Sequence, residues 1–311
     1  MVKGNQTNVR EFILLGFPGS WYLQISLFLL FLFMYFLTLM GNITIISLVG
    51  THRRLHTPMY FFLCNLSFLD IWFTTGYIPK TLVLLVSQSK TISFTSCLLQ
   101  MYFVFSLGCT EYLLLAVMAY DRYLAICRPL RYSSIMNRIC VQLVSGAWTV
   151  GFLYALLNTV FTFKLHFCGP NQIRHFSCEL PPLLQLSCTD TFTNQVVLLT
   201  SAVILGAISF LLTLVSYIHI ISTILRIPSV QGKRKAFSTC SSHLIVVGLL
   251  YLAAFIQYAK PSSVSSVALD EMVSIQYSIL TPMLNPIIYS LKNKEVKTAL
   301  RNILGKFKFL K

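Results

Sequence analysis

Residues 191–225 read TFTNQVVLLTSAVILGAISFLLTLVSYIHIISTIL, a run of 35 residues that contains no Asp, Glu, Lys or Arg. A helix needs about 20 mostly apolar residues to cross the hydrocarbon core of a bilayer. Residues 191–225 exceed that length without one charged side chain, so they predict a transmembrane helix.

Six further stretches have the same character. Five are free of charge, and 55–79 is interrupted only by Asp70. We therefore expect an all-α membrane protein, a seven-transmembrane helix bundle with a short amphipathic C-terminal helix. Charged residues are 11% of the chain, against about 25% in soluble proteins, which excludes a soluble enzyme and a disordered chain. An outer-membrane barrel would show alternating strands of about 10 residues instead. The expected helices cover 22–50, 57–86, 93–126, 139–163, 193–227, 234–259 and 270–290.

The formal net charge of +15 could indicate a nucleic-acid partner, but the basic residues are sorted by position. Seventeen of the 24 lysines and arginines fall in one set of alternate connections and only seven in the other. The positive-inside rule places the seventeen in the cytosol. We therefore expect an extracellular N-terminus, a cytoplasmic C-terminus, the lipid bilayer as a partner and no nucleic acid.

This orientation divides the chain into an extracellular N-terminus at 1–21, a transmembrane domain at 22–290 and a cytoplasmic tail at 291–311. The tail alternates apolar residues with lysines, as in a helix that lies on the inner leaflet. Asn5 begins an Asn-Gln-Thr glycosylation sequon. The first apolar run is far longer than a signal-peptide core, so we expect the first span to act as its own insertion signal.

The one long connection, 164–192, is expected outside the cell. It contains Cys168, Cys178 and Cys188, and Cys97 stands at the outer end of the third helix. Four cysteines in an oxidising compartment allow three pairings, and the sequence pattern does not choose among them. Two disulfides would hold this loop over the bundle.

Polar side chains inside the membrane are costly and mark functional candidates. Asp70 lies in the middle of the second expected helix and Glu111 midway along the third. Asn42, Ser67 and Asn285 could complete a polar core that holds a sodium ion or water. Two alternatives stay open: a hydrogen-bonded network that only fixes helix packing, or carboxyl groups that are protonated because burial disfavours their charge.

Two motifs lie near the expected cytoplasmic side. Met118–Tyr123 contains Asp121-Arg122-Tyr123 at the inner end of the third helix. An arginine at this boundary can hold neighbouring helices by charged hydrogen bonds and release them on activation. Asn285–Tyr289 reads Asn-Pro-Ile-Ile-Tyr and places Pro286 inside a span, which permits a kink.

Five segments, in order along essentially the whole chain, carry a recognisable signature. They are Gly41-Asn42, Leu55–Leu63 with Leu66-Ser67 and Asp70, Met118–Cys127 with Pro129-Leu130, Ser216-Tyr217, and Lys235–Leu244 with Pro282–Leu291. In these segments the chain resembles rhodopsin-like G-protein-coupled receptors and, more closely, vertebrate olfactory receptors. It departs from the family at Leu250-Tyr251-Leu252, where Phe-Tyr-Gly is usual, and at Lys292, where arginine is common.

The resemblance implies an odorant receptor of the plasma membrane and not an enzyme. It implies disulfides Cys97–Cys178 and Cys168–Cys188. It also implies a heterotrimeric G protein of the stimulatory, olfactory type as partner, with cAMP as the signal. The implied G-protein switch comprises Asp121, Arg122, Tyr123, Tyr217, Asn285, Pro286 and Tyr289.

The resemblance further implies a ligand pocket in the outer half of the bundle, for small and mostly neutral volatile molecules. Related amine receptors carry an aspartate in the outer part of the third helix, where this chain has Val104, so a cationic ligand would lack its counter-ion there. Some predicted residues share a helix face by their spacing of four. The predicted lining is Phe103, Val104, Phe105, Gly108, Cys109, Asn158, Ser201, Leu205, Tyr251, Ala254, Phe255, Tyr258, Ile275 and Ser278.

Other functions fit the sequence less well. A transporter or channel would need a polar path or an internal repeat, and a membrane enzyme would need a nucleophile and base at one depth. His175, Cys178 and Glu179 would suit a soft metal, as suggested for relatives, but a disulfide at Cys178 removes the thiolate. We therefore expect no bound metal there, and the only cofactor we consider is the allosteric sodium ion.

Overall fold

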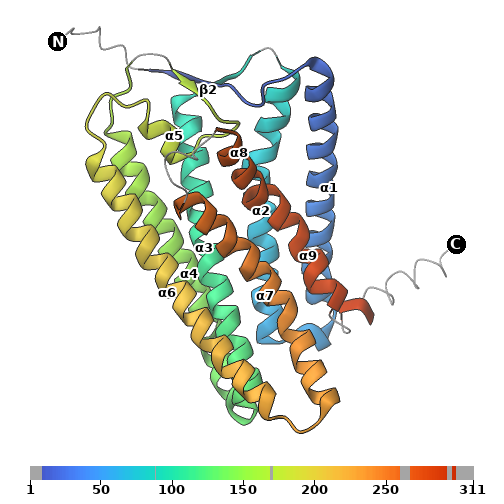
Figure 1. Cartoon of the computed structure of the whole chain (residues 1–311). Coiled ribbons are helices and arrows are strands. Elements are labelled where there is room, and N and C mark those ends of the chain that lie inside the picture. Colours follow the sequence, from blue (N-terminus) through green and yellow to red (C-terminus); the bar gives the residue numbers. More distant parts are fainter. Residues whose placement is uncertain (1–8, 88, 169–170, 260–266, 293–295, 299–311) are drawn as a thin grey trace, which may run out of the picture.

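The computed structural model describes residues 9–87, 89–168, 171–259, 267–292 and 296–298. Six helices in this part of the chain are long and apolar enough to cross a bilayer: α1 (Trp21–Thr51), α2 (Pro58–Val86), α3 (Phe94–Cys127), α4 (Pro129–Phe163), α6 (Phe192–Arg226) and α7 (Val230–Ala259). A seventh span runs without interruption through α8 (Val267–Ile275), the π-helical turn η3 (Gln276–Leu280) and α9 (Thr281–Lys292). The expected seven-transmembrane helix bundle is confirmed (Figure 1).

Most helix ends agree with the sequence prediction, but α4 and α7 begin earlier. α4 starts at Pro129 instead of residue 139, and α7 at Val230 instead of residue 234. The added turns contain basic residues, Arg131 and Arg138 in α4 and Lys233 in α7. A charge-free run marks only the part of a helix that lies in the hydrocarbon core, whereas the hydrogen-bonded helix continues beyond that run.

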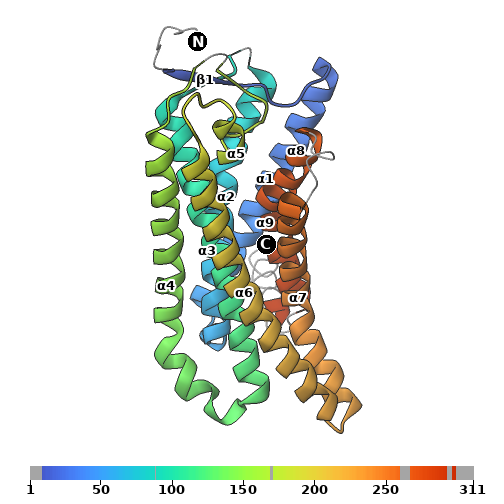
Figure 2. The ribbon, with the colours of Figure 1, turned by 60° about the vertical axis from the view of Figure 1, so that its left-hand side comes forward.

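A small sheet covers one end of the bundle, which we call the sheet end. β1 (Glu11–Leu14) pairs antiparallel with β2 (Thr91–Ser93) and parallel with β3 (Gln172–Ile173). The helix α5 (Leu180–Leu184) lies below the sheet (Figure 2). Phe12, Leu14 and Ile173 are buried against it in a local apolar cluster. The sheet joins three segments that are far apart in the sequence.

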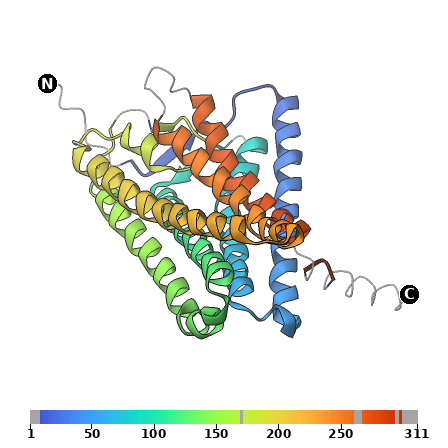
Figure 3. The same ribbon diagram turned by 60° about the horizontal axis from the view of Figure 1, so that its bottom comes forward.

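The opposite end, called here the Arg122 end, contains the turns from α3 to α4 and from α6 to α7 (Figure 1). A 3-10 turn, η1 (Arg53–Leu55), joins α1 to α2. α3 contacts α2, α4, α6 and α7, so it forms the centre of the bundle. α1 and α4 lie on opposite sides of it (Figure 3). The outer faces of α1, α4 and α6 expose leucine, isoleucine, valine and phenylalanine, as helices that face lipid do.

One glycine permits close approach of α3 and α4. A Cβ atom built on Gly151 would lie 2.7 Å from the carbonyl oxygen of Ser106 and would collide with the Thr110 hydroxyl. Small residues at such crossings let helix backbones pack closely in membranes.

We expect Gly151→Ala to destabilise the receptor by about 1–3 kcal/mol, because overpacking forces the two backbones apart. Thermal unfolding of the purified protein in detergent measures the effect. The matched control is Gly146→Ala on the same helix, where an added Cβ meets no atom within 4 Å. Equal melting temperatures for the two variants would contradict the close-packing role of Gly151.

Candidate functional site: a cavity below the loop and a buried arginine end

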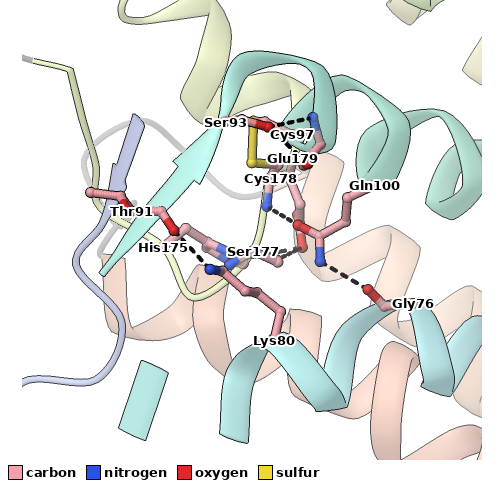
Figure 4. Close-up of a disulfide and its surroundings, with 11 residues drawn as sticks. Gly76, Lys80, Thr91, Ser93, Cys97, Gln100, His175, Ser177, Cys178 and Glu179 are labelled. Atoms are coloured by element: carbon pink, nitrogen blue, oxygen red, sulfur yellow. Dashed lines mark hydrogen bonds and ion pairs between the residues drawn. A yellow bond between two sulfur atoms is a disulfide. The ribbon is translucent and has the colours of Figure 1, made fainter. Parts of the chain in front are cut away.

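Two disulfides fix the loop between α4 and α6 at the sheet end. Cys97 is bonded to Cys178 and Cys168 to Cys188, the pairing that the family resemblance implied. The backbone N–H of Cys178 donates to Gln100 Oε1 at 2.9 Å, and Gln100 Nε2 donates to the Gly76 carbonyl at 2.9 Å. Figure 4 shows this chain of contacts from the loop through α3 to α2. The loop segment that follows Cys178 is therefore held over the bundle.

A cavity of about 170 Å³ lies beneath this segment. Its walls come from α2, α3, α6, α7, α8 and η3, and the loop contributes Glu179 and Pro181. Most of the wall is apolar. The described lining residues are Phe73, Val104, Phe105, Gly108, Cys109, Glu111, Tyr112, Glu179, Pro181, Leu198, Leu250, Ala253, Ala254, Val273 and Tyr277.

The main polar group at the loop side of the cavity is the Glu179 carboxylate. Its Oε1 accepts hydrogen bonds from Ser274 Oγ and Tyr277 Oη, both at 2.9 Å. Longer bonds come from Ser177 Oγ at 3.2 Å and Tyr77 Oη at 3.4 Å. The carboxylate thus joins the loop to α2, α8 and η3.

Five of the predicted pocket residues line this cavity: Val104, Phe105, Gly108, Cys109 and Ala254. The structure places Phe255 elsewhere, since 69% of it is exposed on the outside of α7. Leu250, Ala253 and Ala254 form the cavity face of that helix, and the next residue lies about 100° further round the helix axis. The side chain of Tyr258 lies outside the described residues.

The other predicted residues whose side chains the structure describes do not line the cavity. Phe103 packs on Trp72, with ring centroids 5.5 Å apart, and Asn158 is buried against its own helix with Nδ2 on the Tyr154 carbonyl. Tyr251 packs edge-to-face on Tyr112, which lines the cavity, with centroids 5.6 Å apart. Ser201, Leu205, Ile275 and Ser278 are likewise not among the described lining residues.

Ser201 and Ser278 each donate to a carbonyl of the preceding helical turn, on Val197 and Ser274. Serines in this arrangement satisfy their hydroxyls within their own helix. Neither serine is among the described residues that line the cavity.

Sequence reasoning missed most of the polar lining. It recognised the segment His175–Glu179 only as a metal pattern, which the disulfide at Cys178 disables. The same disulfide holds Glu179 over the cavity, so the loop contributes an acidic side chain that the outer half of α3 lacks. In the sequence, the acidic residue directly after a disulfide cysteine could have indicated this role. The side chains that Glu179 contacts became known only from the fold.

A polar core lies deeper in the bundle. Asn285 Nδ2 donates to both oxygens of Asp70, at 3.1 and 3.0 Å, and Asn42 Nδ2 donates to the Pro282 carbonyl at 3.1 Å. Glu111 interacts electrostatically with Asp70 and also lines the cavity. Ser67 is buried on the same helix as Asp70. The structure therefore brings Asp70, Glu111 and Asn285 together, as the sequence grouping predicted.

Four polar atoms of this region are buried without a hydrogen-bond partner among the described residues. They are Asn42 Oδ1, Glu111 Oε1, Asn285 Oδ1 and Tyr289 Oη. Buried polar groups are normally paired with protein or with ordered water. These four atoms are therefore candidates for contact with a small polar species.

At the Arg122 end, the predicted switch residues also meet. Asp121 is buried and accepts from Tyr132 Oη at 2.8 Å. Arg122 is 9% exposed, and Tyr217 and Tyr289 lie close enough to interact with it electrostatically. Tyr123 instead faces α6, where its ring lies 5.6 Å from that of His219.

His243 is an unpredicted member of this end and is fully buried. Its Nε2 lies 3.0 Å from the Leu115 carbonyl and its Nδ1 lies 2.7 Å from Tyr217 Oη. Because a carbonyl only accepts, Nε2 carries the proton and Nδ1 accepts from the tyrosine. One neutral imidazole thus connects α3, α6 and α7.

Comparison with known proteins agrees with this architecture. A family profile described as olfactory receptor matches residues 31–306. Human Olfactory receptor 6F1 is 54% identical over 308 residues, which cover 98% of this chain and 100% of the relative. Olfactory receptor 287 of Rattus norvegicus is 55% identical over 303 residues, or 96% of each chain, and Olfactory receptor-like protein OLF3 of Canis lupus familiaris is 50% identical over 306 residues, or 98% and 96%. With a matching profile over most of its length and relatives of this similarity, the chain belongs to the olfactory receptor family.

Proposed function

We propose that this receptor binds small, mostly neutral volatile molecules in the cavity beneath the loop. We further propose that it then activates a stimulatory, olfactory-type G protein and raises cAMP. The family implies odorant ligands and G-protein coupling in general. The observation that carries the proposal is the largely apolar cavity between α3, α6, α7 and the disulfide-held loop. Apolar pockets with few polar groups bind small, largely uncharged molecules.

The proposed mechanism is a shift between two conformations. A ligand against Tyr112 and Ala254 would press on α7 through the Tyr112–Tyr251 contact. The favoured state would be one in which α7 moves outward at the Arg122 end and opens a cleft beside Arg122. The ligand shifts this equilibrium only by its difference in affinity for the two states. The hydrogen bonds of His243 join α7 to α3 and α6, so they oppose this movement.

Replacement of Arg122 tests the signalling end. We expect Arg122→Ala to abolish the cAMP response to an agonist found in an odorant screen, because the side chain that would meet the G protein is removed. Surface expression, measured by antibody staining of intact cells, should persist. The matched control is Arg138→Ala, an exposed arginine on α4, which should retain the response. An unchanged response in Arg122→Ala would refute the role.

We also propose that the receptor lies in the plasma membrane with the sheet end outside the cell. The disulfides lie at the sheet end, and disulfides persist in oxidising compartments. The basic connections belong to the other end, as the positive-inside rule requires of the cytosolic side. Asn5, the proposed glycan acceptor, lies outside the described residues, as does most of the tail that we expect to form an amphipathic helix (293–295 and 299–311).

Epitope tags test this orientation. An antibody should label a tag at the N-terminus in intact cells, whereas a tag at the C-terminus should become accessible only after permeabilisation. An odd number of spans requires this asymmetry. Labelling of both tags in intact cells would contradict it.

For the polar core, we propose an allosteric sodium ion. Asn42 Oδ1, Asn285 Oδ1 and Glu111 Oε1 are buried oxygens that accept no hydrogen bond among the described residues, and hard cations prefer oxygen ligands. The negative charge available from Asp70 would offset the charge of the ion. A bound sodium ion would screen the repulsion between Asp70 and Glu111 and would hold α1, α2, α3 and α9 together.

Salt-dependent stability tests this proposal without reference to signalling. The melting temperature of the purified receptor should rise in sodium chloride relative to choline chloride at equal ionic strength, because a ligand of the folded state stabilises it by mass action. Asp70→Asn should remove the difference, and the exposed-loop control Asp190→Asn should keep it. Equal melting temperatures of the unmodified receptor in both salts would favour water in place of sodium.

A further inference from the structure

We propose that Glu179 selects ligands by their hydrogen-bond donors, so that the cavity takes small hydrocarbons bearing a hydroxyl or amine group and rejects carboxylates. This inference rests on the proposed odorant-binding function and names the ligand class of the same cavity.

The charges of the cavity lining favour a ligand that donates hydrogen bonds. Glu179 and Glu111 are the two carboxylic acids among the described lining residues, and these residues include no Lys, Arg or His. A carboxylate on the ligand would meet like charge in a site of low dielectric constant, where repulsion is strong. A hydroxyl or ammonium group on the ligand would instead donate to a carboxylate oxygen for which the apolar wall provides no hydrogen bond.

The buried carboxyl group of Glu111 also favours a ligand that donates hydrogen bonds. It is 2% exposed, lines the cavity, and its Oε1 accepts no hydrogen bond among the described residues. It lies two turns of α3 below Val104, which is about 10 Å along the helix axis. The cavity thus has an acceptor near the loop and another at depth, and the wall between them is mostly apolar.

The hydrogen bonds of Glu179 show how its carboxylate would recognise a hydrogen-bond donor on the ligand. All four hydrogen bonds that its carboxylate accepts among the described residues go to Oε1. The one ion-pair contact found there, with His175 Nε2 at 3.9 Å, also goes to Oε1. An ionised carboxylate accepts on both oxygens, so Oε2 retains its capacity. Because donors from α2, α8 and η3 hold Oε1, the carboxylate is oriented before a ligand arrives, which reduces the entropy lost on binding.

The cavity also limits the size of the ligand. Its volume of about 170 Å³ is close to that of a cavity of about 150 Å³ known to hold benzene. We therefore expect a donor group on a skeleton about as large as a benzene ring or a six-carbon chain.

Matched ligand sets test the inference. One set is benzyl alcohol, benzylamine, benzyl methyl ether and benzoate, and the other is hexan-1-ol, hexylamine, hexyl methyl ether and hexanoate. Binding is measured as the rise in melting temperature of the purified receptor, which requires no G protein. The alcohol or the amine should bind with at least about tenfold higher affinity than the ether, and the carboxylate should not bind. Which of the two donors binds more tightly distinguishes a hydroxyl from an ammonium ligand.

The variant Glu179→Gln tests the residue. It keeps the shape of the side chain but removes its charge, and we expect the donor-to-ether affinity ratio to fall about tenfold. A merely structural role would weaken all ligands equally and leave the ratio unchanged. The matched control is Glu271→Gln, a buried acid of α8 that is not among the described lining residues, which should keep the ratio.

Three results would overturn the inference: ether or carboxylate binding as strong as that of the alcohol and amine, an unchanged ratio in Glu179→Gln, or no binding of any alcohol or amine in either set. The comparison in the unmodified receptor needs no variant, so it decides the matter even if Glu179→Gln does not fold. If donors bind as expected but cAMP does not rise in cells, the signalling proposal fails and the ligand class stands.

Discussion

The hydrocarbon core of a membrane offers no hydrogen-bond partner to a peptide group, and the rest of this structure depends on that constraint. Each span must satisfy its backbone internally, so the chain crosses as helices. Many hydroxyls inside the spans follow the same rule. Thr38, Thr74 and Thr110 each donate to the carbonyl four residues earlier, on Met34, Asp70 and Ser106. Polar groups that escape this local pairing are therefore the informative ones.

Three groups of such exceptions lie at successive levels of the bundle. Glu179 gathers donors from three helical elements at the loop side of the cavity. Asp70 and Asn285 pair deeper down. His243 connects three helices at the Arg122 end. Glu111 links the first two levels, because it lines the cavity and interacts with Asp70. The central helix α3 thus connects the proposed sites for a ligand, an ion and a signalling partner, through Glu111 and the Leu115 carbonyl.

The two ends of the bundle are held by different kinds of bond. Two disulfides and a three-stranded sheet fix the sheet end covalently and through backbone pairing. At the Arg122 end, α7 is held by hydrogen bonds such as Tyr217 to His243 and Ser242 to the Ile288 carbonyl. The net contribution of one hydrogen bond between neutral groups to the stability of the folded state is only about 1 kcal/mol. This asymmetry suits a receptor whose ligand site stays formed while its partner site opens.

The sequence by itself determined the membrane class, the helix count and most helix ends, because the length of an apolar run reports directly on the bilayer. It also grouped Asp70 with Glu111, because both lie near the middle of their expected helices. The grouping of Tyr217 with Arg122 came from the family resemblance. The depth of a residue in the membrane does not determine which way its side chain faces, however. The rotation of α7 decided that Ala254 lines the cavity and Phe255 faces outward. The sheet and Glu179 were likewise decided only by the tertiary structure, because strands of two to four residues and a loop carboxylate acquire their partners from segments distant in the chain.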